Sequence, residues 1–297
     1  MQTPFADKAA ACLLGLACGD ALGAAVEFYP RGRFAPLTDM VGGGKFRLQK
    51  GQWTDDTSMA LCLGESLLAC RGFDAHDQMR RYLRWLHEGH QSSTGRAFGV
   101  GKQTVRALFA YEDSGVVYST LTDSRYSGNG SLMRLAPVVL YFYDSPQLAE
   151  YAELSSKTTH ASAECLQACR YFAEILRRAL SGAAKADVFA GMDEADYPHL
   201  TQIVRQDFKY KSAAEIQGSG YVVESLEAAL WAFWQTDSLR AALLAAANLG
   251  DDADTTAAIC GQLAGAFYGL EAIPPDWLAC LYRADDIEHM ARALAAP

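Results

Sequence analysis

The sequence lacks the features that would place it among nucleic-acid-binding or membrane proteins. It has no surplus of basic residues, because 26 Lys and Arg stand against 35 Asp and Glu and give a formal net charge of −9. General binding to nucleic acid or to an anionic membrane surface depends on such a surplus. No uninterrupted run of about 18 apolar residues is present to form a transmembrane helix. We therefore expect no general nucleic-acid binding and no membrane span, while a local basic pocket for one small phosphate ligand stays open.

The chain also lacks the cysteine spacing of a redox or zinc motif, since none of its eight cysteines forms a Cys-x-x-Cys pair. Most of them stand among alanines and apolar residues, where a thiol behaves as a small hydrophobic group. The segment "AAACLLGLACGDALGAA" has the composition of a signal-peptide core, but Asp7 precedes it and Asp20 interrupts it. We therefore expect reduced thiols, a retained N-terminal segment and a cytoplasmic protein.

No Pro/Ser-rich linker, low-complexity tract or fixed-period repeat marks a domain boundary, so residues 1–297 are expected to form a single domain. Apolar residues recur with helical period in long windows and alternating β-branched segments are scarce, which predicts an all-α fold. The segment 131–143, "SLMRLAPVVLYFY", reads either as a strand or as a helix that begins near Pro137. Two series of glycines indicate helices packed very close together, namely Gly15, Gly19 and Gly23, and Gly261, Gly265 and Gly269.

Two acidic segments are the strongest indication of a functional site. The first is "GQWTDDTSMAL" (51–61), with Asp55 and Asp56, and the second is "NLGDDADTTAAICGQLAGAFYG" (248–269), with Asp252 and Asp254. Capping of a helix contributes only about 0.3–1 kcal/mol per carboxylate, whereas two carboxylates about 4 Å apart repel by roughly 4 kcal/mol at an effective dielectric of about 20. If both segments open onto one place, their four negative charges match two divalent cations. Carboxylate and hydroxyl oxygens suit Mg²⁺, Mn²⁺ or Ca²⁺.

Other patterns allow a functional and a plain interpretation. The glycine-rich loop "YSGNGSLMR" (126–134) offers backbone N–H groups that can cradle a phosphate, although an ordinary turn explains it equally well. His87 and His90 have the spacing of a zinc pair, but no third ligand stands nearby and the end of a helix is the simpler interpretation. The aromatic group around Trp231, Phe233 and Trp234 is expected to anchor the core.

Five short stretches, taken in order, resemble the motifs of the ADP-ribosylglycohydrolases, the family that includes the dinitrogenase-reductase-activating glycohydrolase. They are "GLACGDALGAAVEF" (15–28), "GQWTDDTSMAL" (51–61), "GNGSLMRLAPV" (128–138), "TTH" (158–160) and "GDDADTTAAICGQLAGAFYG" (250–269). The resemblance covers the chain from residue 15 to about residue 280. It implies an orthogonal multi-helix bundle with a binuclear Mg²⁺ or Mn²⁺ centre in a cleft, two ions per chain.

The resemblance also implies roles for particular residues. The metal ligands implied are Thr54, Asp55, Asp56, Asp252, Asp254 and Thr255. Asp251 stands where many relatives have another glycine and is left out of this set. The pyrophosphate and distal ribose would be lined by Ser127, Gly128, Asn129, Gly130, Ser131, Met133 and His160, while Tyr221 would stack on the base.

The implied reaction is hydrolysis of the bond that links ADP-ribose to an arginine or serine side chain of a protein, or to a small acceptor. Such a bond breaks through an oxocarbenium-like transition state, so the site must hold the ribose, activate water and assist the leaving group. Two hard cations can hold the ribose diol and lower the pKa of a bound water. The base is expected to be Glu27, with the aspartates Asp56 and Asp252 as alternatives.

Two positions depart from the family pattern. In the segment "GRAFGVGKQT", Gly99 and Lys102 stand where many bacterial relatives carry an aspartate and an asparagine. The aspartate is expected to face the guanidinium in arginine-directed members. Its loss leaves open serine, nucleobase and small guanidino leaving groups, or another carboxylate that serves in place of the missing one. Two other functions also remain: an ADP-ribose-binding module of immunity or crystallin type with little turnover, and a two-metal phosphohydrolase that releases phosphate. The sequence indicates neither the preferred ion nor the oligomeric state.

Overall fold

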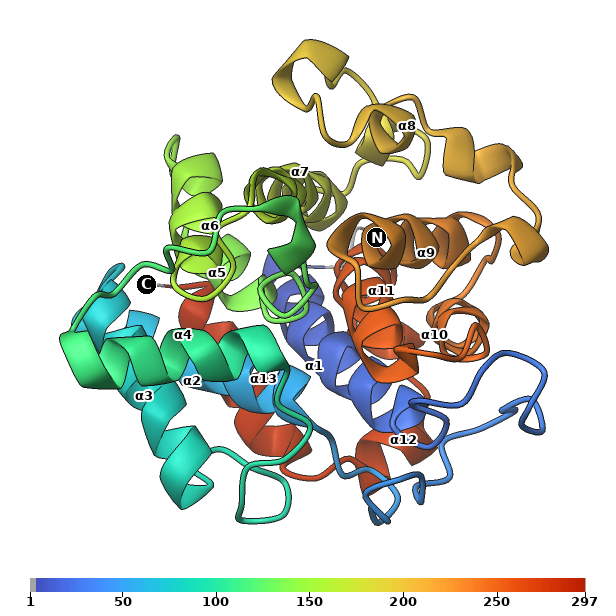
Figure 1. The fold of residues 1–297 in the computed structure, drawn as a ribbon. Helices are drawn as coiled ribbons and strands as arrows, with labels where there is room; N and C mark the ends of the chain where they lie inside the picture. Colours follow the sequence, from blue (N-terminus) through green and yellow to red (C-terminus); the bar gives the residue numbers. More distant parts are fainter. Residues whose placement is uncertain (1–3, 297) are drawn as a thin grey trace.

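The computed structural model describes residues 4–296, and over this range it contains thirteen α-helices, six short 3₁₀ turns and no extended strand (Figure 1). The all-α prediction is therefore confirmed. The helices are α1 (Phe5–Gly23), α2 (Asp55–Cys70), α3 (Ala75–Glu88), α4 (Lys102–Ser114), α5 (Ala136–Tyr141), α6 (Leu148–Lys157), α7 (Ala163–Leu180), α8 (Thr201–Val204), α9 (Val222–Trp234), α10 (Leu239–Ala247), α11 (Ala253–Tyr268), α12 (Pro275–Cys280) and α13 (Ala284–Leu294). The 3₁₀ turns are η1 (Ser124–Tyr126), η2 (Asp187–Phe189), η3 (Glu194–Asp196), η4 (Asp207–Tyr210), η5 (Ala213–Glu215) and η6 (Leu270–Ala272).

Helices α1 and α11 lie side by side in the middle of the molecule, with the remaining helices around them (Figure 1). Their backbones touch at the glycines, as predicted: a Cβ on Gly15 would lie 2.3 Å from the carbonyl oxygen of Gly261, and one on Gly265 would lie 1.9 Å from that of Ala11. Real Cβ atoms essentially never come under 3.0 Å of another heavy atom, so only glycine fits these positions. Gly269 differs from the prediction, because it ends α11 with a φ of 81°.

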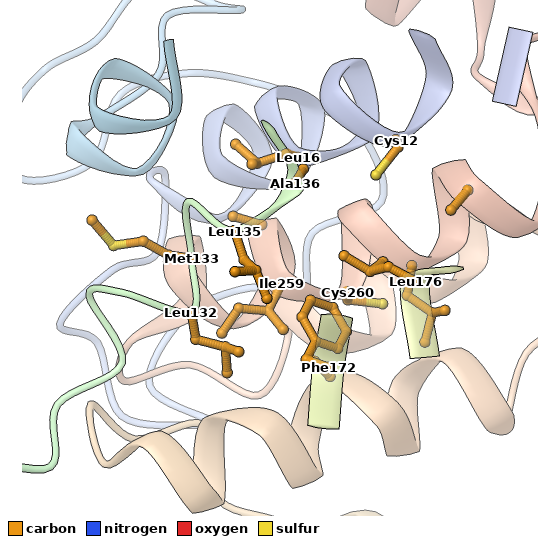
Figure 2. Packing of buried hydrophobic residues seen from close by; sticks show 14 of the residues in the cluster. Cys12, Leu16, Leu132, Met133, Leu135, Ala136, Phe172, Leu176, Ile259 and Cys260 are labelled. Atoms are coloured by element: carbon orange, nitrogen blue, oxygen red, sulfur yellow. The ribbon is translucent and has the colours of Figure 1, made fainter. Parts of the chain in front are cut away.

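The central pair also supports the segment that follows the glycine-rich loop. Figure 2 shows Leu132 and Leu135 among side chains of α1, α7 and α11. The buried amide of Gln262 fixes this backbone, since its Oε1 accepts a hydrogen bond from Ala136 N (2.8 Å) and its Nε2 donates to Met133 O (2.9 Å). The segment then continues as α5, so the helical alternative for residues 131–143 is confirmed and the strand alternative is wrong.

The remaining expectations about the core also hold within the described residues. All eight cysteines carry free thiols and six are buried, whereas Cys70 is exposed and Cys280 is half-buried. Phe233 is buried, and Trp231 packs in the core while its indole donates to Lys211 O at 2.9 Å. None of the helices in residues 4–296 combines the length and the apolar character that crossing a membrane requires.

Candidate active site

The two acidic segments meet at the beginnings of α2 and α11. The Thr54 Oγ1 atom lies 3.2 Å from Asp56 Oδ2 and also 3.2 Å from Asp254 Oδ2, which is 200 positions away in the sequence. Both helix N-termini therefore present their unpaired N–H groups and positive dipole ends to the same carboxylates. We call the six acids that gather here the acidic cluster; its members are Asp20, Glu27, Asp55, Asp56, Asp252 and Asp254.

Asp20 is the member of the acidic cluster that the sequence did not reveal. It is fully buried on α1 and accepts four hydrogen bonds. Thr54 donates its N–H and its hydroxyl to Oδ1, both at 2.8 Å, and Thr57 donates its N–H (3.0 Å) and its hydroxyl (2.7 Å) to Oδ2. Asp20 therefore caps α2 from another helix, and the Thr54 side chain itself makes no hydrogen bond that caps α2. A single acid inside an apolar helix was the available signal, because such a group is buried only with partners.

The acidic cluster has the donor set and the electrostatics of a cation site. One carboxylate oxygen from each of Asp20, Asp56 and Asp254 lies within 4.8 Å of the others, and a second group contains Glu27, Asp252 and Asp254. Asp254 belongs to both groups and therefore links them. Thr54 has one hydroxyl proton for three nearby carboxylate oxygens, so at most one of them receives it.

Burial and mutual repulsion raise the pKa values across the cluster. Burial, followed by the charge of Asp20, raises the pKa of Asp55 to about 8. Burial also raises the pKa of Glu27 to about 8 and holds the pKa values of Asp56 and Asp254 well above their ordinary range. Two buried oxygens, Glu27 Oε2 and Asp56 Oδ1, have no hydrogen-bond partner among the described residues. Because carboxylate oxygens prefer hard cations, these residues fit divalent ions such as Mg²⁺ or Mn²⁺.

A cavity of about 690 Å³ joins the acidic cluster to the glycine-rich loop. Of the residues implied by the sequence, its wall contains Glu27, Asp55, Asp252, Asp254, Thr255, Gly128, Asn129, Gly130, Met133 and His160. Thr54 and Asp56 are not part of this wall; they lie buried behind it, within the hydrogen-bonded cluster. Ser127, Ser131 and Tyr221 are also absent from the wall.

The glycine loop, residues 127–133, is fixed to the start of α9 by its backbone. Ser127 O accepts from Val222 N at 2.9 Å, and Asn129 N donates to Gly220 O at 3.1 Å. The Asn129 amide donates to Asp252 Oδ2 at 2.7 Å, so this loop also orients one acid of the cluster.

The two serine hydroxyls of the glycine loop turn into the protein. Ser127 Oγ donates to Ser162 Oγ (2.8 Å), and Ser131 Oγ accepts from Ser156 Oγ (2.8 Å). This arrangement leaves backbone groups and glycines, and not these hydroxyls, to face the cavity.

His160 and Arg134 support the glycine loop. The guanidinium of Arg134 is fully buried and donates to Gly130 O (3.0 Å) and to Thr159 Oγ1 (2.7 Å), while it lies over the Tyr82 ring at 4.7 Å. No carboxylate within residues 4–296 forms a salt bridge with it. Thr159 Oγ1 is in turn 2.8 Å from His160 Nδ1.

His160 is held as a neutral imidazole. Burial and the charge of Arg134 lower the pKa of His160 to about 3. Its ring lies close to the loop, since a Cβ on Gly130 would come within 2.8 Å of Cε1. No sequence motif predicts a role for Arg134, although an arginine inside the apolar run "SLMRLAPVVL" is the signal that could indicate a buried cation.

Three other sequence expectations fall in or near this region. Tyr221 precedes α9, is 40% exposed and borders a neighbouring cavity of about 460 Å³. Its backbone forms an isolated bridge with that of Gly128 in the glycine loop. Gly99 and Lys102 both line the main cavity, so the position that lacks the expected acid does face the site. His87 and His90 do not form a zinc pair, because they contact different acids, Glu112 at 3.0 Å and Glu65 at 2.6 Å.

The helical fold and the acid-lined cavity define a protein class that comparison with known sequences identifies. The profile of the ADP-ribosylglycohydrolase family matches residues 1–297, and the chain belongs to this family. It is 41% identical over 289 residues to the ADP-ribosylarginine hydrolase Tri1 of Pseudomonas putida, covering 97% of this chain and 78% of that protein. It is 34% identical over 282 residues to the ADP-ribosyl-[dinitrogen reductase] glycohydrolase of Rhodospirillum rubrum, covering 93% and 90%.

A solved structure supports the same conclusion. A chain described as an ADP-ribosylglycohydrolase-related protein complex superposes with a TM-score of 0.88 at 45% identity and covers 98% of both chains. The family, its fold and the enzyme class, a hydrolase of ADP-ribose linkages, are therefore as the resemblance implied.

Proposed function

We propose that this enzyme hydrolyses the N-glycosidic bond between ADP-ribose and an arginine side chain of a modified protein, with two Mg²⁺ or Mn²⁺ ions as cofactors. The observation that carries the proposal is that Asp254, which belongs to two carboxylate groups, lines one cavity together with Glu27, Asp252 and the glycine loop. The names of two relatives support this choice. One is an ADP-ribosylarginine hydrolase, which supports arginine as the linked residue. The other is a glycohydrolase of ADP-ribosyl-[dinitrogen reductase], which supports a modified protein as the substrate.

In this proposal the acidic cluster holds the ions through Thr54, Asp55, Asp56, Asp252, Asp254 and Thr255, with Asp20 bracing Thr54 from behind. When bound, the ions supply compensation of negative charge and Lewis acidity toward the ribose hydroxyls and water. The unpartnered oxygens of Glu27 and Asp56 favour a cation here, because a buried carboxylate oxygen without a donor is costly.

The glycine loop is the proposed binding site for the pyrophosphate. Gly128 and Gly130 let an anion approach backbone N–H groups, and the Arg134 charge behind the loop favours negative groups in front of it. His160, being neutral, can donate or accept one hydrogen bond without adding charge. Tyr221, which borders the neighbouring cavity, is proposed to meet the base.

The bond-breaking step follows from the position of Glu27. Its carboxylate accepts a proton from a water molecule as the water oxygen forms a bond with the anomeric carbon of the ribose. The bond from that carbon to the arginine nitrogen breaks, the nitrogen takes up a proton from solvent while Glu27 releases its proton to solvent, and ADP-ribose and an unmodified arginine side chain result. Glu27 suits this task because it lines the cavity and its second oxygen has no hydrogen-bond partner within residues 4–296.

The test is to incubate the protein with Mg²⁺ or Mn²⁺ and with arginine-, serine- and nucleobase-linked ADP-ribose substrates, and to identify the products by mass. We expect free ADP-ribose and unmodified arginine, with loss of turnover but retained ADP-ribose binding in Glu27→Gln. Binding of ADP-ribose without cleavage of any substrate would instead indicate the binding-module function, and release of inorganic phosphate would indicate a phosphohydrolase.

A further inference from the structure

Three phenylalanine rings, Phe28, Phe46 and Phe98, pack in a row that begins next to Glu27, and Phe28 is the one of them that lines the cavity. Phe28 follows Glu27 directly, lines the cavity and is 52% exposed. Its ring meets Phe46 edge-on at 6.2 Å between centroids, and Phe46 lies 5.0 Å from Phe98. The proposed base and this exposed ring are therefore adjacent in the sequence and line the same cavity.

The backbone holds Phe28 in an unfavourable conformation. Its φ is 67°, in the left-handed region that a bulky residue rarely adopts. Two hydrogen bonds to Asp251 maintain it: Phe28 N donates to Asp251 O (2.7 Å), and Asp251 N donates to Tyr29 O (2.9 Å). Strain of this kind persists where the surrounding structure fixes it, and it gathers at binding and catalytic sites. The segment that supplies the acidic cluster thus also keeps the Phe28 ring in the cavity wall.

The Phe28 ring already carries a cation. The Lys45 ammonium lies 4.4 Å from its centroid, on an exposed loop in which Gly42, Gly43 and Gly44 all have positive φ. Within residues 4–296 no carboxylate forms an ion pair with Lys45. The face of the Phe28 ring therefore binds the Lys45 ammonium through a cation–π interaction, with no carboxylate as a counter-ion.

The cavity wall at Gly99 is tightly packed and lacks the acid that the family resemblance leads one to expect at this position. Gly99 has a φ of 78°, and a Cβ there would lie 2.5 Å from Asp55 Oδ1. The acids that line the cavity outside the proposed ion ligands are Glu27, the proposed base, and Asp251. A cationic leaving group must therefore be recognised mainly by Phe28 or by Asp251.

Resting on the arginine activity proposed above, we infer that Phe28 is the specificity-determining residue for the leaving group. Its ring face receives the guanidinium of the modified arginine, and Lys45 leaves the ring when the substrate binds. A guanidinium is planar and weakly hydrated, so it stacks on an aromatic face better than an ammonium does. Two consequences distinguish this role from a purely structural one: loss of the ring lowers selectivity for a cationic leaving group, and loss of Lys45 improves it.

The experiment compares turnover of an arginine-linked substrate with the affinity for free ADP-ribose, which contains everything except the leaving group. Phe28→Leu should lower kcat/KM for the arginine-linked substrate by about tenfold and leave the Kd of ADP-ribose unchanged, whereas Phe28→Tyr should retain most of the activity. Lys45→Met should lower KM for the same substrate. Phe98→Leu is the matched control, because Phe98 belongs to the same row of rings but does not line the cavity, and it should behave as the parent.

Several results would overturn the inference. An equal loss of ADP-ribose affinity and of turnover in Phe28→Leu would show that the ring only shapes the cavity. If Asp251→Asn abolished the response to arginine while Phe28→Leu did not, the carboxylate would be the recognition group. A parent enzyme that binds ADP-ribose but cleaves no arginine linkage would refute the proposed function first, and the role of Phe28 with it. A circular dichroism melt of each variant identifies any loss of folding.

Discussion

Replacement of Asp20 by asparagine tests whether this hidden acid holds the site together. Asparagine has nearly the same shape, but one of its two terminal groups is an amide N–H₂. Whichever way the amide turns, one backbone N–H, of Thr54 or of Thr57, then faces a donor and not an acceptor. A hydrogen bond to a charged group contributes about 1.5–3 kcal/mol, and a buried donor without an acceptor costs about 1–3 kcal/mol. The threonine hydroxyl can rotate to accept from the amide, so about 2–4 kcal/mol of unfolding free energy should be lost with Mg²⁺ present.

The assay is urea unfolding of parent and variant, with Mg²⁺ and with a chelator. In chelator the loss should be smaller, because the substitution also removes one negative charge that repels Asp56 and Asp254. Asp7→Asn is the matched control, because it makes the same change on the same helix at a half-exposed residue. The ion pair of Asp7 with Arg292 contributes about 0.2–1 kcal/mol to stability. A loss for Asp20→Asn no larger than that of the control, or a larger loss in chelator than in Mg²⁺, would refute the reasoning.

Three further changes test the electrostatics of the site. Mg²⁺ at about 100 times its Kd should stabilise the parent by about 2.7 kcal/mol in a thermal melt, and Asp254→Asn should abolish this response; a variant that still responds as the parent does contradicts the shared-ligand role. In chelator, the free energy of unfolding should fall as the pH rises from about 4 to 8. Glu27 and Asp55 have folded-state pKa values of about 8, above unfolded-state values of about 4. The folded state therefore binds more protons than the unfolded state over this pH range, and it loses this advantage as the pH rises. Mg²⁺ should flatten that slope, and an identical slope with and without Mg²⁺ contradicts the cation site. Arg134→Met should raise the pKa of His160 in an NMR titration, because the charge of Arg134 helps to lower that pKa, and it should weaken ADP-ribose binding. An unchanged pKa of His160 would show that Arg134 does not influence the imidazole.

The sequence predicts most of the fold because its signals are local. Helical periodicity identifies the long helices, and the glycine spacing predicts the contact between α1 and α11, which depends only on the absence of a side chain. Gly269 follows the same spacing but ends its helix, because its φ of 81° suits a C-terminal position. The glycine pattern does not distinguish these two uses.

The part of the candidate site that can be predicted from the sequence consists of residues whose type alone indicates their chemical role. Adjacent acids and threonines indicated a cation site, and two separate segments of the same kind indicated one shared place. The partners of Asp20 and the buried charge of Arg134 depend on which helices pack together, so no local pattern contains them. The direction of the Ser127 and Ser131 hydroxyls is likewise set by Ser162 and Ser156, which belong to other segments.

The contact between α1 and α11 also decides where the acids stand. At its end, a Cβ on Gly23 would lie 2.4 Å from the Cα atom of Asp254 and 2.4 Å from Ala253 O. A side chain at this position must therefore displace the backbone of the residue shared by both carboxylate groups, and Glu27 follows only four residues later. The close packing that glycine permits is thus a condition for bringing the proposed base and the proposed ion ligands into one cavity. A substitution at Gly23 should consequently impair the site more than the same substitution at Gly15, whose contact is with Gly261, away from the acids.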